Sequence, residues 1–125
     1  MTPQDHMKLY EAKINLRRFE EVEPLVSADA TFWFTDGTHH GLDDIRNAFE
    51  KTWAQLGNET YWLEDVDWVA VGDQAASCIY RFRWKAEIDG RTLEGEGRGT
   101  TVLSREGPNW KIVHEHLSRF PAKAS

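Results

Sequence analysis

Two histidines near the end of the chain, His114 and His116, are the residues best placed to do chemistry. They lie in the segment 110–118, whose apolar and β-branched residues are typical of a strand. Side chains two positions apart in a strand point to the same face, so the two imidazoles would lie roughly 7 Å apart beside Trp110 and Ile112. An imidazole titrates near neutral pH and can donate, accept or bind a metal. The spacing predicts either a pocket wall with two acid–base groups or a core with two hydrogen-bonded histidines.

Asp36 is a third candidate for proton transfer. It follows the strand-forming run Thr-Phe-Trp-Phe-Thr at 31–35 and could act as a general base if the mouth of a pocket withheld it from water. An aspartate directly before Gly37 is also typical of a turn. A metal site is disfavoured, because His-x-His supplies only two ligands and a third would have to come from a loop. Motifs for nucleotides, phosphates or a catalytic nucleophile are missing, so no cofactor is expected.

The composition is that of one globular domain. The chain has 125 residues, 40% of them apolar, and its six Trp, six Phe and three Tyr can fill one core, so we interpret residues 1–125 as a single domain. A net charge of −6 argues against nucleic acid or a membrane surface as partner. The single cysteine, Cys78, allows no internal disulfide, and no apolar run approaches the roughly 20 residues of a membrane span. A cytoplasmic protein is therefore expected.

The pattern of apolar residues predicts helices first and strands last. Met7, Tyr10 and Ile14 share one helical stripe after the start signal Thr2-Pro3. Helical segments are expected at 2–20, 21–26 and 42–56, and strands at 30–35, 61–71, 74–88, 91–104 and 110–120. Short turns join the last four strands. Helices followed by a long meander are typical of an α+β fold in which N-terminal helices cover a curved antiparallel sheet.

The last hairpin indicates which residues neighbour the two histidines. Counted from the turn at 106–109, an in-phase antiparallel register places Thr101 opposite His114 and Gly99 opposite His116. Other inward residues of the strand 91–104 are glycine or apolar: Leu93, Gly95, Gly97 and Leu103. Three alternate glycines indicate sharp curvature or space for a ligand, unless aromatic rings such as those of Phe82 or Trp84 fill the gap.

The segments "DATFWFTDG" and "RGTTVLSREGPNWKIVHEHLS", with the strands between them, resemble the SnoaL-like domains of the nuclear transport factor 2-like superfamily. The resemblance covers nearly the whole chain, and its most specific part is the ending W-x-I-V-H-x-H-x-S. It implies a cone-shaped α+β barrel, a conical pocket closed by the helices, and a homodimer formed through the outer face of the sheet. The kinase II association domain, an assembly module, has a similar ending.

The resemblance leaves the reaction open, because the superfamily contains isomerases, cyclases, dehydratases, limonene epoxide hydrolases and non-enzymatic assembly domains. The positions of the ketosteroid isomerase acid–base trio correspond to Phe34, Thr101 and Ile14, none of which can serve in its place. A shifted set is therefore predicted, with Asp36 as base and Tyr10, His114 or His116 as donors.

The leading hypothesis is an aromatic-lined pocket for a small apolar organic molecule, with cofactor-free isomerase, dehydratase or hydrolase chemistry through Asp36 and His116. The alternative is a non-enzymatic dimerisation or assembly domain. The expected ligand-binding residues are Phe32, Phe34, Trp53, Tyr80, Phe82, Trp84 and Thr101.

Overall fold

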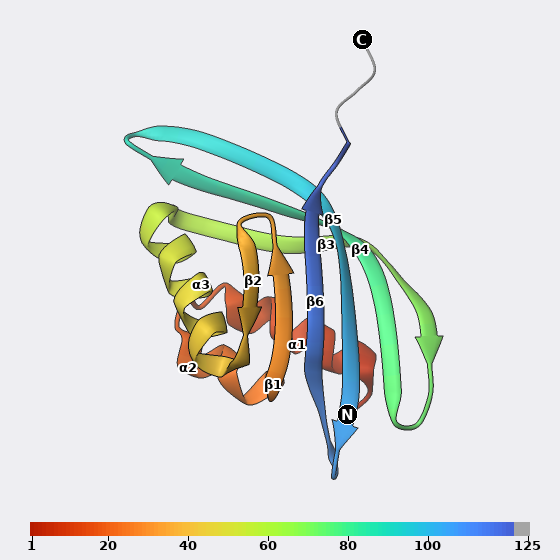
Figure 1. Ribbon diagram of the computed structural model, residues 1–125. Helices are drawn as coiled ribbons and strands as arrows, with labels where there is room; N and C mark the ends of the chain where they lie inside the picture. The colour runs from red at the N-terminus through yellow and green to blue at the C-terminus, as the bar shows by residue number, and fades with distance from the viewer. Residues whose placement is uncertain (122–125) are drawn as a thin grey trace.

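The computed structural model describes residues 1–121, so positions 122–125 of the expected domain lie outside the described residues. Three helices and a one-turn 3-10 helix (η1) combine with six strands (Figure 1). Their bounds are α1 (Pro3–Ile14), α2 (Phe19–Val22), η1 (Glu23–Leu25), β1 (Val26–Phe34), β2 (Gly37–His40), α3 (Gly41–Gln55), β3 (Gly57–Val71), β4 (Ala75–Ile88), β5 (Arg91–Glu106) and β6 (Asn109–Arg119). None of the helices in residues 1–121 is long and apolar enough to span a membrane.

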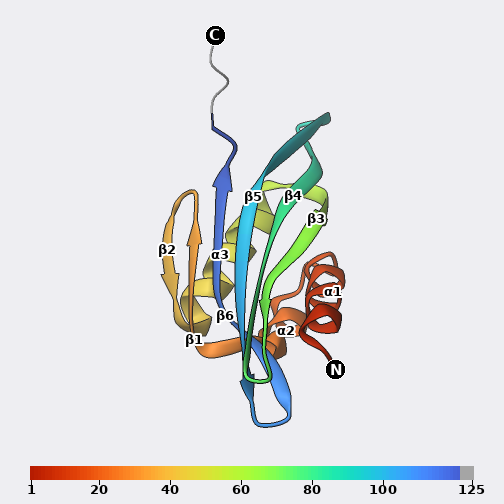
Figure 2. The same ribbon diagram turned by 90° about the vertical axis from the view of Figure 1, so that its right-hand side faces the viewer.

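The strands form one curved sheet in the order β2-β1-β6-β5-β4-β3. The predicted α+β class, with N-terminal helices against a curved sheet, is confirmed. Two details differ: the sheet stays open, with β2 and β3 at its edges, and β1 pairs with β6 in parallel. Figures 1 and 2 show the sheet curling around the helices, with the β4–β5 hairpin reaching over one end of α3. This curvature creates the hollow that holds the site.

The first helix begins where the sequence indicates but ends earlier than expected. Thr2 and Asp5 form a capping box, and Pro3 occupies the first turn. The predicted helix 2–20 stops at Ile14, because the chain turns at Arg17, which adopts a left-handed φ of 57°. This turn brings Arg17 beneath α3, where its guanidinium donates to backbone carbonyls at that helix's end.

Aromatic rings fill the space above the alternate glycines of β5. Gly95, Gly97 and Gly99 lie directly opposite Trp84, Phe82 and Tyr80 on β4. A Cβ added at any of the three would lie within 3.0 Å of the facing ring. The glycines therefore let three large rings lie flat against the neighbouring strand, which is one of the alternatives that the sequence left open.

The pairing of β5 with β6 follows the prediction from the turn up to Ile112. The next pair is Val102 with His114, so Val113 is an extra residue on β6, a β-bulge. Because side chains alternate between faces, one extra residue moves every later side chain to the opposite face. The regular register that was expected beyond Ile112 is wrong. Glu115 is the residue whose side chain points to the concave face.

His114 and His116 consequently lie on the outer face of the sheet, and their predicted place on the pocket wall is wrong. Both rings pack edge-on against Trp33 of β1, with centroid distances of 4.9 and 5.5 Å. His114 Nδ1 also lies 2.7 Å from the carbonyl oxygen of Thr31. Thr101, expected opposite His114, lies opposite Glu115.

Candidate functional site

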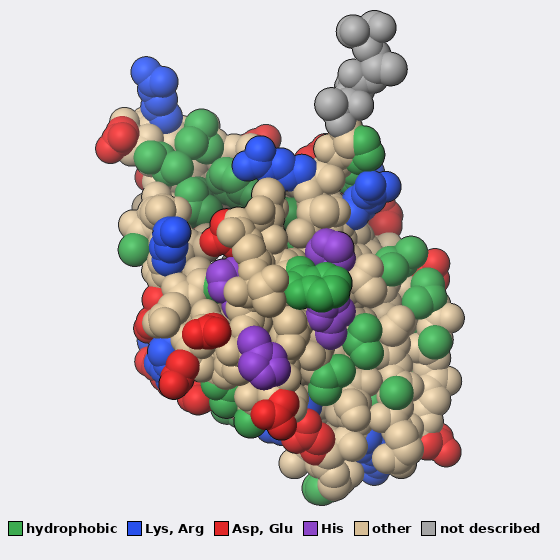
Figure 3. All heavy atoms as spheres, in the orientation of Figure 1, with side chains coloured by type: hydrophobic (Ala, Val, Ile, Leu, Met, Phe, Trp, Pro, Cys, Tyr) green, Lys and Arg blue, Asp and Glu red, His purple; other side chains and the backbone are tan. Residues whose placement is uncertain are grey.

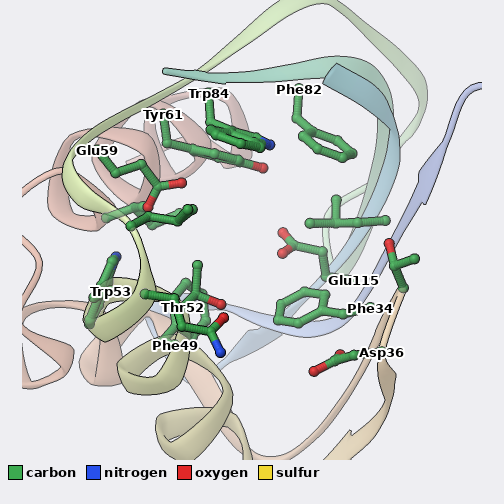
Figure 4. A pocket seen from close by; sticks show the side chains of 15 residues that line it. Phe34, Asp36, Phe49, Thr52, Trp53, Glu59, Tyr61, Phe82, Trp84 and Glu115 are labelled. Atoms are coloured by element: carbon green, nitrogen blue, oxygen red, sulfur yellow. The ribbon is translucent and has the colours of Figure 1, made fainter. Parts of the chain in front are cut away.

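A cavity of about 330 Å³ lies between α3 and the concave face of the sheet (Figure 4). Its walls are mainly aromatic, and the rings come from β1, α3, β3 and β4. They are those of Phe34, Phe49, Trp53, Tyr61, Phe82 and Trp84. A volume and lining of this kind suit a small organic molecule, because rings remove its apolar surface from water.

Three carboxyl groups face this apolar space. Asp36 lies at the rim, just after β1, whereas Glu59 of β3 and Glu115 of β6 belong to opposite walls (Figure 4). Among the three, Glu115 is the most deeply buried, with 2% of the residue exposed. The cavity therefore combines apolar walls with acids at different depths.

The Glu115 carboxylate is held by three hydroxyl groups. Tyr10 Oη of α1 donates to Oε2 at 3.1 Å, and Thr101 Oγ1 of β5 donates to Oε1 at 3.1 Å. Tyr80 Oη of β4 lies 3.3 Å from Oε1 and 2.7 Å from Thr101 Oγ1. None of the ion pairs within residues 1–121 includes Glu115. Within the described residues, the Glu115 carboxylate is therefore stabilised by hydrogen bonds from neutral hydroxyl groups and by no ion pair.

Burial raises the pKa of Glu115 from 4.5 to about 7, and the hydrogen bonds from Tyr10, Thr101 and Tyr80 offset only part of this rise. Burial, reinforced by the charge on Glu115, also raises the pKa of both tyrosines well above 10, so they remain donors. Near neutral pH both protonation states of Glu115 are populated. This is the condition under which one group serves well as general base and general acid.

The predicted site residues fall into three places. Phe34, Trp53, Phe82, Trp84 and Asp36 line the cavity. Phe32, Tyr80, Thr101 and Tyr10 are buried behind it, and the last three hold Glu115. His114 and His116 lie on the outer face.

Asp36 does not meet the condition under which the sequence made it a base. Its side chain is 56% exposed, and its Oδ1 lies 3.1 Å from Nε2 of His39. Water therefore reaches the carboxyl at the rim of the cavity. Asp36 is placed to contact a bound molecule at its outer end.

Sequence reasoning missed Glu115, Glu59 and the rings of Phe49 and Tyr61. Tyr61 begins a predicted strand and Phe49 belongs to a predicted helix face, so both could have been included from periodicity. One feature of the sequence pointed to Glu115, which is an acid within an apolar strand. The face of the sheet to which its side chain points, however, depends on the bulge at Val113. Within the described part of the chain, no group of three or more His, Cys, Asp or Glu could hold a metal ion.

Comparison with solved structures identifies relatives of the same fold. A nuclear transport factor 2 (NTF2-like) superfamily protein from Salmonella enterica serovar Typhimurium LT2 is 24% identical, with a TM-score of 0.84 over 97% of this chain and 89% of that one. The association domain of C. elegans CaMKII is 18% identical, with a TM-score of 0.73 over 90% and 88%. Hexachlorocyclohexane dehydrochlorinase LinA-type3 from Novosphingobium barchaimii LL02 is 13% identical, with a TM-score of 0.80 over 92% and 82%.

These identities show a shared fold and no more. A comparison with curated protein sequences gives no match. The sequence itself matches the SnoaL-like domain family over residues 6–123, which covers every strand described above and all of the helices except the first three residues of α1. The chain therefore belongs to the SnoaL-like domain family.

Proposed function

We propose that the protein binds a small, largely apolar organic molecule in the aromatic cavity and that Glu115 exchanges a proton with it. The observation that carries this proposal is the buried Glu115 carboxyl at the wall of the cavity, with a pKa of about 7. Such a group can take a proton from a weakly acidic carbon or return one without a cofactor.

The surrounding hydroxyls support this role. Tyr10 and Thr101 donate hydrogen bonds to different oxygens of the Glu115 carboxyl, which fixes the plane of that carboxyl relative to the cavity. Isomerisation and elimination suit this arrangement, because one carboxyl can remove a proton and then return it or pass it to water. Hydrolysis would require a water molecule positioned as well. The dehydrochlorinase among the structural relatives is named for an elimination, which supports the class of reaction without fixing the substrate.

A probe substrate tests the proton transfer without knowledge of the natural one. 5-Nitrobenzisoxazole loses its C3 proton to a base while its N–O bond breaks, which opens the ring to a single product, a cyano-substituted nitrophenolate that absorbs visible light. We expect turnover by the wild type and a loss of about 100-fold or more in kcat/KM in Glu115→Gln. His116→Ala, on the outer face, is the matched control and should retain the rate. Equal rates for Glu115→Gln and wild type would refute the role of Glu115.

The second candidate function is self-association through the outer face of the sheet. Trp33 is 46% exposed there between His114 and His116, and Figure 3 shows histidines on both sides of a hydrophobic side chain over β1 and β6. Ile79 of β4, which is 43% exposed and lies opposite Thr100, itself the partner of His116, adds apolar surface to this face. Apolar surface of this kind on a curved sheet is typical of an interface.

The oligomeric state tests this second function. We expect a homodimer in sedimentation velocity and a shift toward monomer in Trp33→Glu, because a charge would have to be buried in the interface. Leu16→Glu, an exposed apolar residue in the loop after α1, is the control. A wild-type monomer at all concentrations tested would refute self-association and leave the cavity proposal untouched.

A further inference from the structure

The cavity is acidic as well as aromatic. Asp36, Glu59 and Glu115 belong to its lining, and among the described residues that line it none carries a positive charge. Figure 4 shows Glu59 and Glu115 on opposite sides, with their carboxyl groups turned toward the space between them. A molecule that fills this space would therefore lie between two acids.

Arg17 is a cation beside this lining, and its guanidinium already has hydrogen-bond partners. Its guanidinium donates to the carbonyl oxygen of Trp53, and at 2.6 Å to that of Leu56, at the carboxyl end of α3. Burial raises the pKa of Glu59, and the charge on Arg17 offsets this only in part. The hydrogen bonds of the Arg17 guanidinium thus go to the carboxyl end of α3.

The pKa of Tyr61 reflects the negative charge near the cavity. Burial raises its pKa well above 10, and the charges of Glu115 and Glu59 raise it further. The faces of the neighbouring rings add to this field, because the π face of an aromatic ring is negative.

From this arrangement we infer that the ligand is an organic cation, an aromatic or alicyclic amine whose charged nitrogen lies among the rings between Glu59 and Glu115. This inference rests on the proposed function, because it names the ligand class for the same cavity. A desolvated ammonium group is stabilised both by carboxylates and by ring faces. A carboxylate or phosphate ligand would be repelled by those acids that are ionised and would meet no cation in the described lining.

Three probes of similar shape test the charge preference: tryptamine (cation), tryptophol (neutral) and indole-3-propionate (anion). Binding is measured by isothermal titration calorimetry at about pH 8, where Glu115 is mostly ionised. We expect tryptamine to bind about tenfold more tightly than tryptophol, and indole-3-propionate to bind more weakly than both. In Glu59→Gln and in Glu115→Gln the ratio of tryptamine to tryptophol affinity should fall several-fold.

Glu106→Gln is the matched control, because it removes the same charge from the exposed end of β5. Its affinity ratio should equal that of the wild type, which separates a local effect from the net charge. If tryptophol binds as well as tryptamine, or if both cavity variants keep the wild-type ratio, the cation inference fails while the proposed cavity stands. If none of the three probes binds, the proposed function and this inference fail together.

Discussion

Tyr10 Oη of α1 donates a hydrogen bond to Glu115 Oε2 of β6 at 3.1 Å, across 105 positions of sequence. Tyr10 is 1% exposed and Glu115 2%, so water does not compete for this bond. The pair fixes the first helix to the middle of the sheet and turns the carboxyl toward the cavity. Folding and the proposed chemistry thus depend on the same contact, and each can be tested separately.

Glu115 should make the protein more stable in mild acid. A carboxyl whose pKa is raised from 4.5 to about 7 binds its proton more tightly in the folded state, so its ionisation opposes folding. Between pH 8 and pH 5, protonation of Glu115 should add about 2–3 kcal/mol to the free energy of unfolding, as linkage of these two pKa values gives. The gain begins as the pH falls through about 7 and is complete below 4.5.

Urea unfolding of wild type and Glu115→Gln across this pH range isolates the effect. The comparison is needed because burial lowers the pKa of His6, which makes the folded state lose stability as the pH falls. Both chains share that loss, so it cancels in their difference. A difference that stays constant with pH would mean that Glu115 has an ordinary pKa.

Tyr10→Phe should disturb Glu115 without emptying the core, because only the hydroxyl is removed. The hydrogen bond from Tyr10 lowers the pKa of Glu115, so its loss should move that pKa further upward. We expect a loss of about 1–3 kcal/mol in stability, because a buried carboxylate loses a donor. Carbon-13 NMR titration of the Glu115 carboxyl measures the pKa. Lys8→Met, at an exposed position of the same helix, should leave it unchanged.

Much of the fold was predictable because its signals are local. The capping residues of α1, the apolar face of α3 and the turns of the long hairpins are each encoded within a few positions. The short strand β2 (Gly37–His40) was missed because its four residues show no apolar alternation. Its pairing with β1 supplies the regularity that its sequence lacks.

The central residue of the site was not predictable for a different reason. The direction of Glu115 depends on the bulge at Val113, and nothing in the residues around Val113 distinguishes a bulged strand from a regular one. The bulge arises where β6 pairs with both β5 and β1, and the β1 pairing is irregular at the same place. One displaced position was enough to exchange His114 and His116 for Glu115 on the inner face.

The pH dependence of probe turnover should distinguish Glu115 from Asp36. If Glu115 is the base, kcat/KM for 5-nitrobenzisoxazole should rise with pH, bend near 7 and then level off. Asp36→Asn should keep the same inflection, because Asp36 is mostly exposed and pairs with His39. Stopped-flow or plate absorbance measures the profile. If the inflection disappears in Asp36→Asn, Asp36 and not Glu115 is the base.

Gly95→Ala tests whether the alternate glycines of β5 are needed for the rings on β4 to pack against that strand. In a strand, replacing glycine by alanine ordinarily stabilises by about 0.5–1 kcal/mol, because glycine loses more backbone entropy on folding. At Gly95 the added methyl would meet the Trp84 indole and, among the three nearest atoms, no backbone. The ring must then move off β5 into the cavity, so we expect a loss of about 1–3 kcal/mol in stability and weaker probe binding.

Repeating the substitution in Trp84→Ala removes the obstacle, and there alanine should be neutral or stabilising. A double-mutant cycle from urea unfolding measures the difference, and additive effects would show that Trp84 does not depend on the glycine.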